Sequence, residues 1–105
     1  HVTDVSDNVL MEVQGSGVVG IGTDDPADWA ATLEPSLVVY GGNLGGITIA
    51  NSSTTGNSYL NFADGTSGNA AYRGYMLYDH ANDKMSLATA ATIGVIIDSG
   101  VYFKR

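Results

Sequence analysis

Residues 72–87 have the sequence YRGYMLYDHANDKMSL, and this stretch sets the expected fold of the chain. Its first part is rich in aromatic and apolar side chains, which favour a strand over residues 72–78. Residues 79–83, DHAND, are polar and typical of a connecting turn. Residues 85–87 then alternate apolar and polar side chains, which indicates a second strand running back along the first.

Similar short segments, separated by Gly, Asn, Asp and Ser, occur on both sides of this stretch. We expect strands at residues 10–14, 18–21, 37–40, 47–49, 59–62, 93–97 and 101–103. Ile93, Val95 and Ile97 should share one face, because side chains alternate along a strand. Turns at such short intervals are typical of an antiparallel meander and not of βαβ units. The sequence therefore predicts an all-β fold, an antiparallel meander or sandwich-like domain.

One short helix is expected after the strand at 18–21. The sequence Thr23-Asp24-Asp25-Pro26 is a helix start signal, in which Asp25 can cap the helix and Pro26 suits its first position. The helix would cover residues 27–33 and end before Pro35, because a residue that precedes proline avoids the helical region.

The length of 105 residues favours a single domain. We expect residues 1–17 to be an N-terminal lead-in or linker and residues 18–105 to be the β-rich domain. The first residue is His1 and not Met, which indicates a processed product or an excised fragment. Much of the sequence is Gly, Ser, Thr, Asn and Ala, which bury little apolar area. We therefore expect oligomerisation to complete the core.

The charge balance disfavours several partners. The net charge is −7, and of the four Lys and Arg residues only Arg73 and Lys84 lie outside the last two positions. Nucleic acid and anionic membrane surfaces need more cations than this, so neither is expected as a partner. No apolar run approaches the roughly 18 residues of a membrane span, and we expect no membrane insertion. The absence of cysteine excludes disulfides, thiol catalysis and thiolate-ligated zinc.

The segment Gly15-Ser16-Gly17-Val18-Val19-Gly20 matches the dinucleotide-binding pattern G-x-G-x-x-G. That function requires a helix to start inside the motif and to hold a pyrophosphate at its N-terminus. Here Gly22 and Pro26 oppose a helix, and Asp24 and Asp25 would repel phosphate. We interpret the segment as a structural turn and expect no cofactor.

Two groups of titratable residues are candidates for metal binding or acid/base chemistry. Asp24, Asp25 and Asp28 lack the spacing of a calcium loop, and helix capping explains them, so no metal is expected. His80 lies beside Asp79 and near Asp83, which makes an acid/base pair conceivable. A histidine in a loop is more often a structural hydrogen-bonding residue. We therefore expect no catalytic residues and no enzymatic activity.

Aromatic residues accompanied by Arg and Asn could form a carbohydrate-binding platform, because ring faces stack on sugars while the polar groups bond their hydroxyls. The aromatic residues considered are Trp29, Tyr59, Tyr72, Tyr75, Tyr78 and Tyr102. The candidate ligand-binding residues are Tyr72, Arg73, Tyr75, Tyr78, His80 and Asn82, with Trp29 as second choice. In the competing interpretation, the tyrosines of residues 72–78 bridge subunits and Arg73 pairs with an Asp of a neighbouring chain.

Four segments, in order, resemble an element of bacteriophage tail fibres and tailspikes. VGIGTDDP (19–26) followed by ATLE (31–34) is similar to "VGIGT-x-x-P … A-x-L-x-V", although Pro35 and the Asp24-Asp25 pair depart from it. SYLNFADG (58–65) is similar to "s-x-L-x-F-a-d-g". RGYMLYDHANDKMSL (73–87) and IDSGV (97–101) resemble "G-x-I-x-Y-d-H-x-x-d-x-M-x-F" and "I-D-s-s-G-x-V". The resemblance covers residues 18–103.

The resemblance implies a structural or adhesion module of a virion fibre, located outside the cell and supporting host attachment as shaft or receptor-binding head. Such fibres are intertwined parallel homotrimers of β-rich chains, so the implied partners are two further copies, other tail-fibre segments, and a host surface glycan or protein. In such proteins a C-terminal endosialidase-type intramolecular chaperone often follows; none follows Arg105 here. In a trimer we expect Met76, Met85, Leu87 and Ile97 to be buried.

The alternative is a stand-alone, lectin-like carbohydrate-binding β domain. A glycan depolymerase is less favoured, because such enzymes need paired carboxylates in a cleft and the chain has only two glutamates, Glu12 and Glu34.

Overall fold

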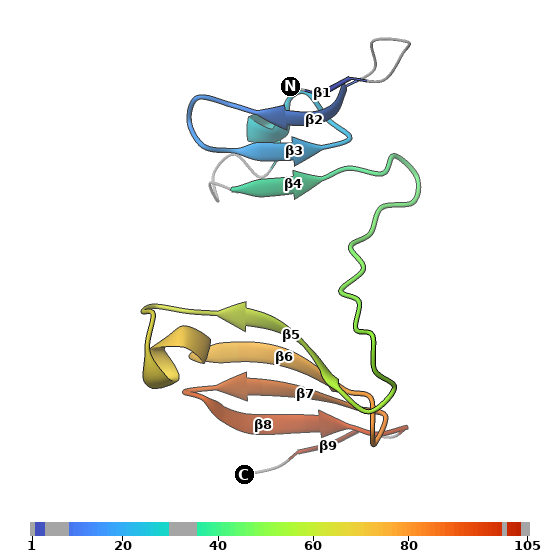
Figure 1. Cartoon of the computed structure of the whole chain (residues 1–105), viewed down its shortest axis with the longest axis vertical. Helices are drawn as coiled ribbons and strands as arrows, with labels where there is room; N and C mark the ends of the chain where they lie inside the picture. The colour runs from blue at the N-terminus through green and yellow to red at the C-terminus, as the bar shows by residue number, and fades with distance from the viewer. Residues whose placement is uncertain (1, 4–8, 30–35, 100, 104–105) are drawn as a thin grey trace. The chain divides into compact units, whose positions relative to one another are not determined.

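The structure is a computed structural model that describes residues 2–3, 9–29, 36–99 and 101–103. The chain forms two compact units, His1–Thr48 and Ile49–Arg105, and each contains its own sheet (Figure 1). The described residues are mostly β with two short 3-10 helices, which confirms the all-β prediction. The boundary expected at 17/18 lies in the turn between two paired strands, whereas the units divide after Thr48.

The first unit contains a four-stranded sheet in the order β1-β2-β3-β4. Its strands are β1 (Val2–Thr3), β2 (Val9–Val13), β3 (Val19–Ile21) and β4 (Leu37–Val39). β2 and β3 pair antiparallel, but β4 lies parallel to β3. The chain therefore enters β4 at the end of the sheet where β3 begins. The parallel pair departs from the predicted meander.

The G-x-G-x-x-G segment forms the β2–β3 turn. The Gly17 amide donates to the Gln14 carbonyl at 2.8 Å, and the Gln14 amide donates to the Val18 carbonyl at 2.9 Å. Gly17 has φ of 93°, a conformation that favours glycine. A strand follows and not a helix, so the turn predicted at this motif is confirmed.

The expected helix is shorter than predicted. Only Pro26–Asp28 form a 3-10 turn, η1, and Trp29 is already extended, while residues 30–33 lie outside the described part of the chain. Asp25 occupies the cap position without a side-chain capping bond; its backbone amide instead donates to Thr23 Oγ1 at 3.2 Å. Pro26 is buried against Gly20, where an added Cβ would come within 3.0 Å of the proline Cβ. This turn is thus held by packing and not by the predicted cap.

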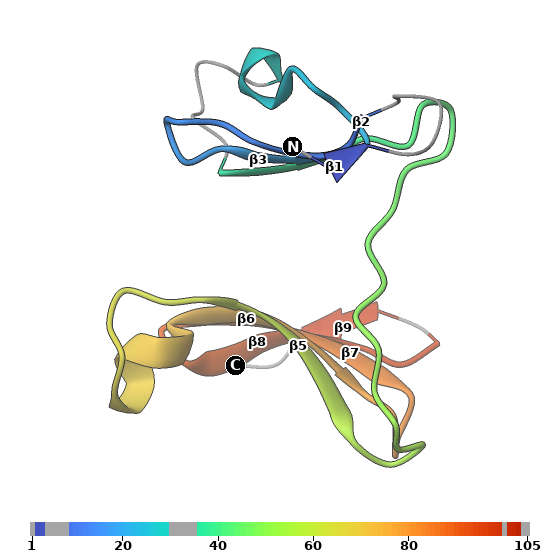
Figure 2. The ribbon, with the colours of Figure 1, turned by 45° about the horizontal axis from the view of Figure 1, so that its top comes forward.

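The second unit contains a five-stranded sheet whose neighbouring strands are consecutive and antiparallel, which is the predicted meander. The strands are β5 (Asn57–Phe62), β6 (Gly74–Asp79), β7 (Lys84–Thr89), β8 (Thr92–Ile97) and β9 (Val101–Phe103). The 3-10 helix η3 (Gly68–Tyr72) lies between β5 and β6 at one end of the sheet (Figure 2). Tyr72 therefore belongs to this helix and not to the predicted strand.

The segment 47–49 was predicted to be a strand and is not one. Alternation alone does not make a strand, because the backbone amides and carbonyls also need a paired neighbour. The division between the two units falls within this segment, after Thr48.

The register of β5–β8 sorts the side chains of the second unit onto two faces, because cross-strand partners point the same way. One row is Leu60, Met76, Leu87 and Val95. The adjacent row is Tyr59, Leu77, Ser86 and Ile96. We call the first side the apolar face, which carries Leu60, Phe62, Met76, Met85, Leu87, Val95 and Ile97, together with the uncharged polar residues Ser58, Tyr78 and Thr89. The second side is the tyrosine face, with Asn57, Tyr59, Asn61, Tyr75, Leu77, Asp79, Lys84, Ser86, Ala88, Ile93 and Ile96.

A β-bulge overturns one prediction about these faces. Leu87 pairs with Val95, but Ala88 pairs with Ile93, so Gly94 is an extra residue in β8. The bulge moves Ile93 onto the tyrosine face, whereas Val95 and Ile97 remain on the apolar face. The expectation that all three share a face was wrong because simple alternation does not anticipate the extra residue.

The described part of the second unit buries no large side chain completely. Its buried side chains are small: Ser86 is 5% exposed and Ala88 is 6% exposed. Ala88 lies between its larger cross-strand partners Tyr75 and Ile93, which cover it within the same sheet. Large apolar side chains stay open, since Phe62 is 60% exposed and Leu60 is 47% exposed. The buried side chains of this sheet are covered by their neighbours within the sheet, and the described residues of the second unit form no second layer over its apolar face.

The two-residue turn between β7 and β8 allows a test of its left-handed backbone conformation. Ala90 and Ala91 have φ of 50° and 60°, in a left-handed region that costs a residue with a Cβ roughly 1–2 kcal/mol. Asn-Gly is the preferred pair for such hairpin turns. Ala91→Gly should therefore raise the free energy of unfolding by about 1 kcal/mol, measured by urea denaturation.

The matched control is Ala63→Gly, since Ala63 is exposed and is not among the residues with positive φ. Glycine there gains no relief of strain and adds freedom to the unfolded chain, so it should not stabilise. Equal effects of the two substitutions would contradict the turn geometry.

Candidate functional site

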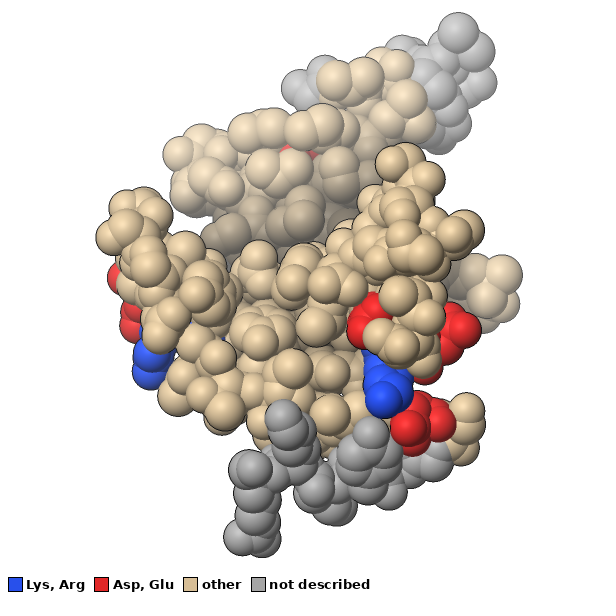
Figure 3. All heavy atoms as spheres, turned by 60° about the horizontal axis from the view of Figure 1, so that its bottom comes forward, with Lys and Arg blue, Asp and Glu red and all other residues tan. Residues whose placement is uncertain are grey.

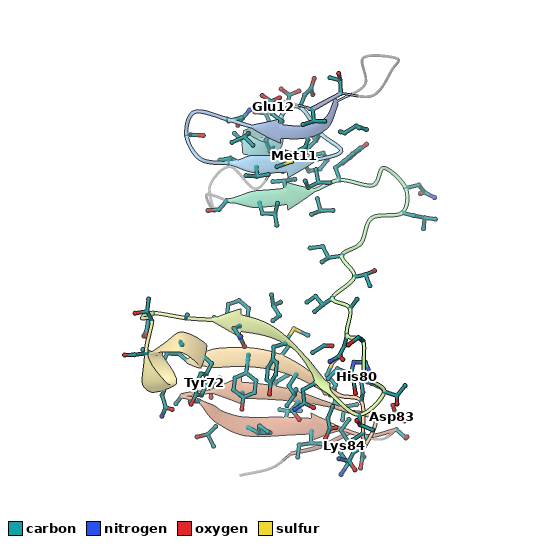
Figure 4. All side chains as sticks on the ribbon, in the orientation of Figure 1. Met11, Glu12, Tyr72, His80, Asp83 and Lys84 are labelled. Carbon is teal, nitrogen blue, oxygen red and sulfur yellow. The ribbon has the colours of Figure 1, made fainter. Side chains whose placement is uncertain are left out.

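The structure places the sequence-predicted binding residues at three separate locations. Trp29 lies in the first unit, where its ring contacts Tyr40 at a centroid distance of 5.3 Å. Tyr72, Arg73 and Tyr75 lie at the junction of η3 and β6. The remaining three, Tyr78, His80 and Asn82, lie around the β6–β7 turn, and Figure 4 shows Tyr72 and His80 at opposite ends of the sheet.

A groove of about 240 Å³ lies on the tyrosine face, lined by Tyr59, Asn61, Tyr72 and Tyr75. We call it the tyrosine groove. The ring of Tyr75 meets that of Tyr59 at a centroid distance of 5.9 Å and that of Tyr72 at 6.3 Å, both nearly edge to face. Three elements thus contribute one tyrosine each to a single hollow.

Strand register and a local loop assemble this groove. Asn61 lies directly opposite Tyr75, and Tyr59 lies two residues from Asn61 on the same face. The loop after β5 folds back because the amides of Asp64 and Gly65 both donate to the Ala70 carbonyl, at 2.9 and 3.2 Å. These two bonds bring η3, and with it Tyr72, back beside β5.

The groove offers both ring surfaces and polar groups. The Tyr72 hydroxyl donates to Asn69 Oδ1 at 2.8 Å, which fixes its ring. The Tyr59 hydroxyl accepts a long bond of 3.4 Å from Asn57 Nδ2. Within the described chain, neither the side-chain amide of Asn61 nor the hydroxyl of Tyr75 has a hydrogen-bond partner. All four lining side chains are uncharged. Such a hollow suits a neutral ligand that has both an apolar face and hydroxyl groups.

The candidate ligand-binding residues predicted from the sequence do not include Tyr59 and Asn61. The signal was present in residues 59–62, whose alternation places Tyr59 and Asn61 on one face. Linking them to Tyr75 requires the register of β5 on β6, which the sequence alone does not supply.

The β6–β7 turn uses its polar side chains to hold itself together. The Asp79 carboxylate accepts bonds from the Ala81 amide at 3.0 Å, the Asn82 amide at 3.3 Å and Asn82 Nδ2 at 2.9 Å. The Tyr78 hydroxyl donates to Asp83 Oδ1 at 3.1 Å. These bonds give Tyr78 and Asn82 structural roles in the turn.

His80 is anchored in the same region. Its Nε2 lies 3.1 Å from Ser58 Oγ, and its ring meets that of Tyr78 at a centroid distance of 4.9 Å. Asp79, the neighbour with which an acid/base pair was conceivable, directs its carboxylate at the turn amides. The contacts of His80 are those of a residue that ties β5 to the β6–β7 turn.

These bonds shift two pKa values in opposite directions. The Asn82 side-chain amide, followed by the backbone amides of Asn82 and Ala81 and the nearby Lys84, lowers the pKa of Asp79 despite some desolvation. The hydrogen bond to Asp83 raises the pKa of Tyr78, with desolvation and the Asp83 charge acting the same way. The hydrogen bonds that lead both shifts hold the turn together.

The acidic cluster of the first unit is repulsive. The charge of Asp24, followed by desolvation and the charge of Asp28, raises the pKa of Asp25. Among the described residues, no three His, Asp or Glu side chains converge so that they could hold a metal ion. The described residues likewise contain no helix with the length and apolar character needed to cross a membrane.

Comparison of the chain with models of known protein families and with curated proteins finds no match. Function must therefore be argued from the two faces of the second sheet and from the resemblance of the sequence segments.

The pKa of Asp79 provides a test of the β6–β7 turn. A carboxyl whose pKa is lower in the folded chain stabilises it above the unfolded pKa, and that stability is lost as the pH falls through the folded pKa. In a pH titration followed by NMR, the Asp79 carboxyl should titrate below 3.8. Asn82→Ala should bring the midpoint back toward 3.8, because it removes the largest cause of the shift.

The control is Asn69→Ala, which removes an asparagine whose partner is Tyr72 in η3 and should leave the Asp79 midpoint unchanged. A midpoint at or above 3.8 in the unsubstituted chain would contradict the described turn.

Proposed function

We propose that this chain is a non-enzymatic structural and adhesion module of a bacteriophage tail fibre or tailspike, which assembles as a parallel homotrimer and supports host attachment from the virion surface. The observation that carries the proposal is the uncovered apolar face of the β5–β9 sheet. The ordered resemblance over residues 18–103 supplies the biological setting.

The apolar face leaves several large side chains exposed to solvent. Exposed fractions are 60% at Phe62, 47% at Leu60, 40% at Leu87 and 38% at Met76. Complete burial of a side chain of this kind contributes roughly 1.5–3 kcal/mol relative to exposure. Contiguous apolar patches on a protein surface mark interaction sites. Covering this face therefore offers a large gain in stability.

The lack of charge on the apolar face is compatible with a second copy of this chain as the occupant. With a net charge of −7 per chain, copies repel one another unless they meet on an uncharged surface. In the described strands β5–β8, the positions on the apolar face hold no charged residue. In Figure 3 most of the Lys, Arg, Asp and Glu side chains in view lie toward the left and right margins, with residues of other kinds between them. Met76, Met85, Leu87 and Ile97, which we expect to be buried in a trimer, all lie on the apolar face.

The second candidate function is a stand-alone lectin-like domain, which the tyrosine groove favours. The two candidates differ in assembly: a lectin that acts alone requires a stable single chain. They also share an expectation that no glycan is hydrolysed, since the Tyr78 hydroxyl bonds to Asp83 and the Asp79 carboxylate bonds to backbone amides of the turn.

Light scattering tests the assembly. The chain should have a molar mass of three times the 10.9 kDa of one copy. Leu87→Lys, which places a charge in the middle of the apolar face, should shift the population to single chains. The loss of a buried leucine costs roughly 2–5 kcal/mol, which weakens association about 30-fold or more for each copy.

Asn57→Lys is the matched control, because Asn57 is exposed on the opposite face of the same sheet and should leave the trimer intact. Circular dichroism verifies that Leu87→Lys retains its strands; if it does not, the milder Met76→Gln replaces it. A single-chain mass for the unsubstituted protein, or a folded Leu87→Lys trimer, contradicts the proposal.

A further inference from the structure

We infer that the tyrosine groove binds one neutral pyranose ring of a glycan, with Tyr59 and Tyr72 stacking on the sugar and Asn61 and Tyr75 bonding its hydroxyls. The inference rests on the proposed adhesion function, for which it names the class of receptor and the residues in contact with it.

The first argument is the arrangement of the rings. Tyr75 is half-buried between Tyr59 and Tyr72, which keep 46% and 40% of their surface exposed. Their near edge-to-face contacts hold the rings at different inclinations. A pyranose ring has apolar C–H faces, and an exposed tyrosine offers a flat surface of matching character. These rings come from three elements and converge on one hollow, so they form a site and not a stripe along one strand.

The second argument is the supply of polar groups. The Asn61 side chain carries two donors and one carbonyl acceptor, and the Tyr75 hydroxyl both donates and accepts. Neither group has a hydrogen-bond partner in the described chain, so both are available to a ligand. The Tyr72 hydroxyl uses its proton on Asn69 Oδ1 and keeps its oxygen as an acceptor. Mixed donors and acceptors beside ring surfaces match the hydroxyl groups of a sugar.

The third argument is size and charge. Pockets for drug-sized ligands measure roughly 300–1,000 Å³, and this groove measures about 240 Å³, which fits a single ring. Its four lining residues are uncharged, and the chain carries a net charge of −7, so an acidic sugar is disfavoured. Arg73 follows Tyr72 in the sequence but does not line the groove.

The position of the groove is compatible with assembly. Tyr59, Asn61 and Tyr75 belong to the tyrosine face, opposite the face that we propose is covered by other copies. The competing interpretation, in which Tyr72, Tyr75 and Tyr78 all bridge subunits, does not fit one flat contact, because Tyr78 pairs with Ser58 and Met85 on the apolar side of the sheet.

The test is an NMR titration of the labelled full chain with the methyl glycosides of glucose, galactose, mannose and N-acetylglucosamine, and with methyl glucuronide as the charged probe. At least one neutral glycoside should shift the amide signals of Tyr59, Asn61, Tyr72 and Tyr75, and the charged probe should bind at least tenfold more weakly. Tyr59→Phe should keep binding, because it retains the ring, and Tyr59→Ala should weaken it at least tenfold. Asn61→Ala should weaken it similarly.

Tyr78→Phe is the control, since it removes a hydroxyl that bonds Asp83 on the other side of the sheet and should leave binding unchanged. The inference is overturned if no neutral glycoside shifts these signals, or if Tyr59→Ala and Tyr59→Phe bind equally well. It is also overturned if Tyr59→Ala or Asn61→Ala abolishes assembly while the chain stays folded, because the groove would then be a subunit contact.

Light scattering on the same samples separates this inference from the proposed function. A trimer that binds no glycoside contradicts the inference alone. A single chain that binds a glycoside in the groove supports the inference and contradicts the trimeric module.

Discussion

The register of strands β5–β8 decides which side chains of the second unit meet. Pairing Leu60 with Met76 and Leu87 collects apolar side chains on one side of the sheet. The same pairing sets Tyr59 and Asn61 beside Tyr75 on the other. A slip of one residue between β5 and β6 would mix the two sets, because side chains alternate along a strand. The sheet therefore has two chemically different faces only in this register.

The sequence predicted the fold of the second unit better than that of the first. The hairpin of residues 72–87 could be recognised because its alternation and its Asp- and Asn-rich turn agree with each other. The parallel pairing of β4 with β3 could not, since it depends on a contact between distant segments. The bulge at Gly94 could not be predicted from the sequence either, because glycine is compatible with both a regular strand and an extra residue.

The candidate site was predicted in part. Tyr72 and Tyr75 were identified by their chemistry, and the structure brings them together in the groove. Tyr78, His80 and Asn82 have similar chemistry, but their hydrogen bonds belong to Ser58 and to the β6–β7 turn. Composition identifies residues that are able to bind a sugar. Only register and the η3 loop decide which of them lie together, and which remain available to a ligand.

The central claim, that other copies cover the apolar face while the tyrosine face stays open, can be tested directly with single thiols. The chain has no cysteine, so Tyr59→Cys and Leu60→Cys each introduce one. These neighbours are 46% and 47% exposed in the single chain and lie on opposite faces. In the assembled protein, a maleimide reagent should label Tyr59→Cys at least tenfold faster than Leu60→Cys, and denaturant should equalise the rates. Equal rates in the native protein would contradict the account.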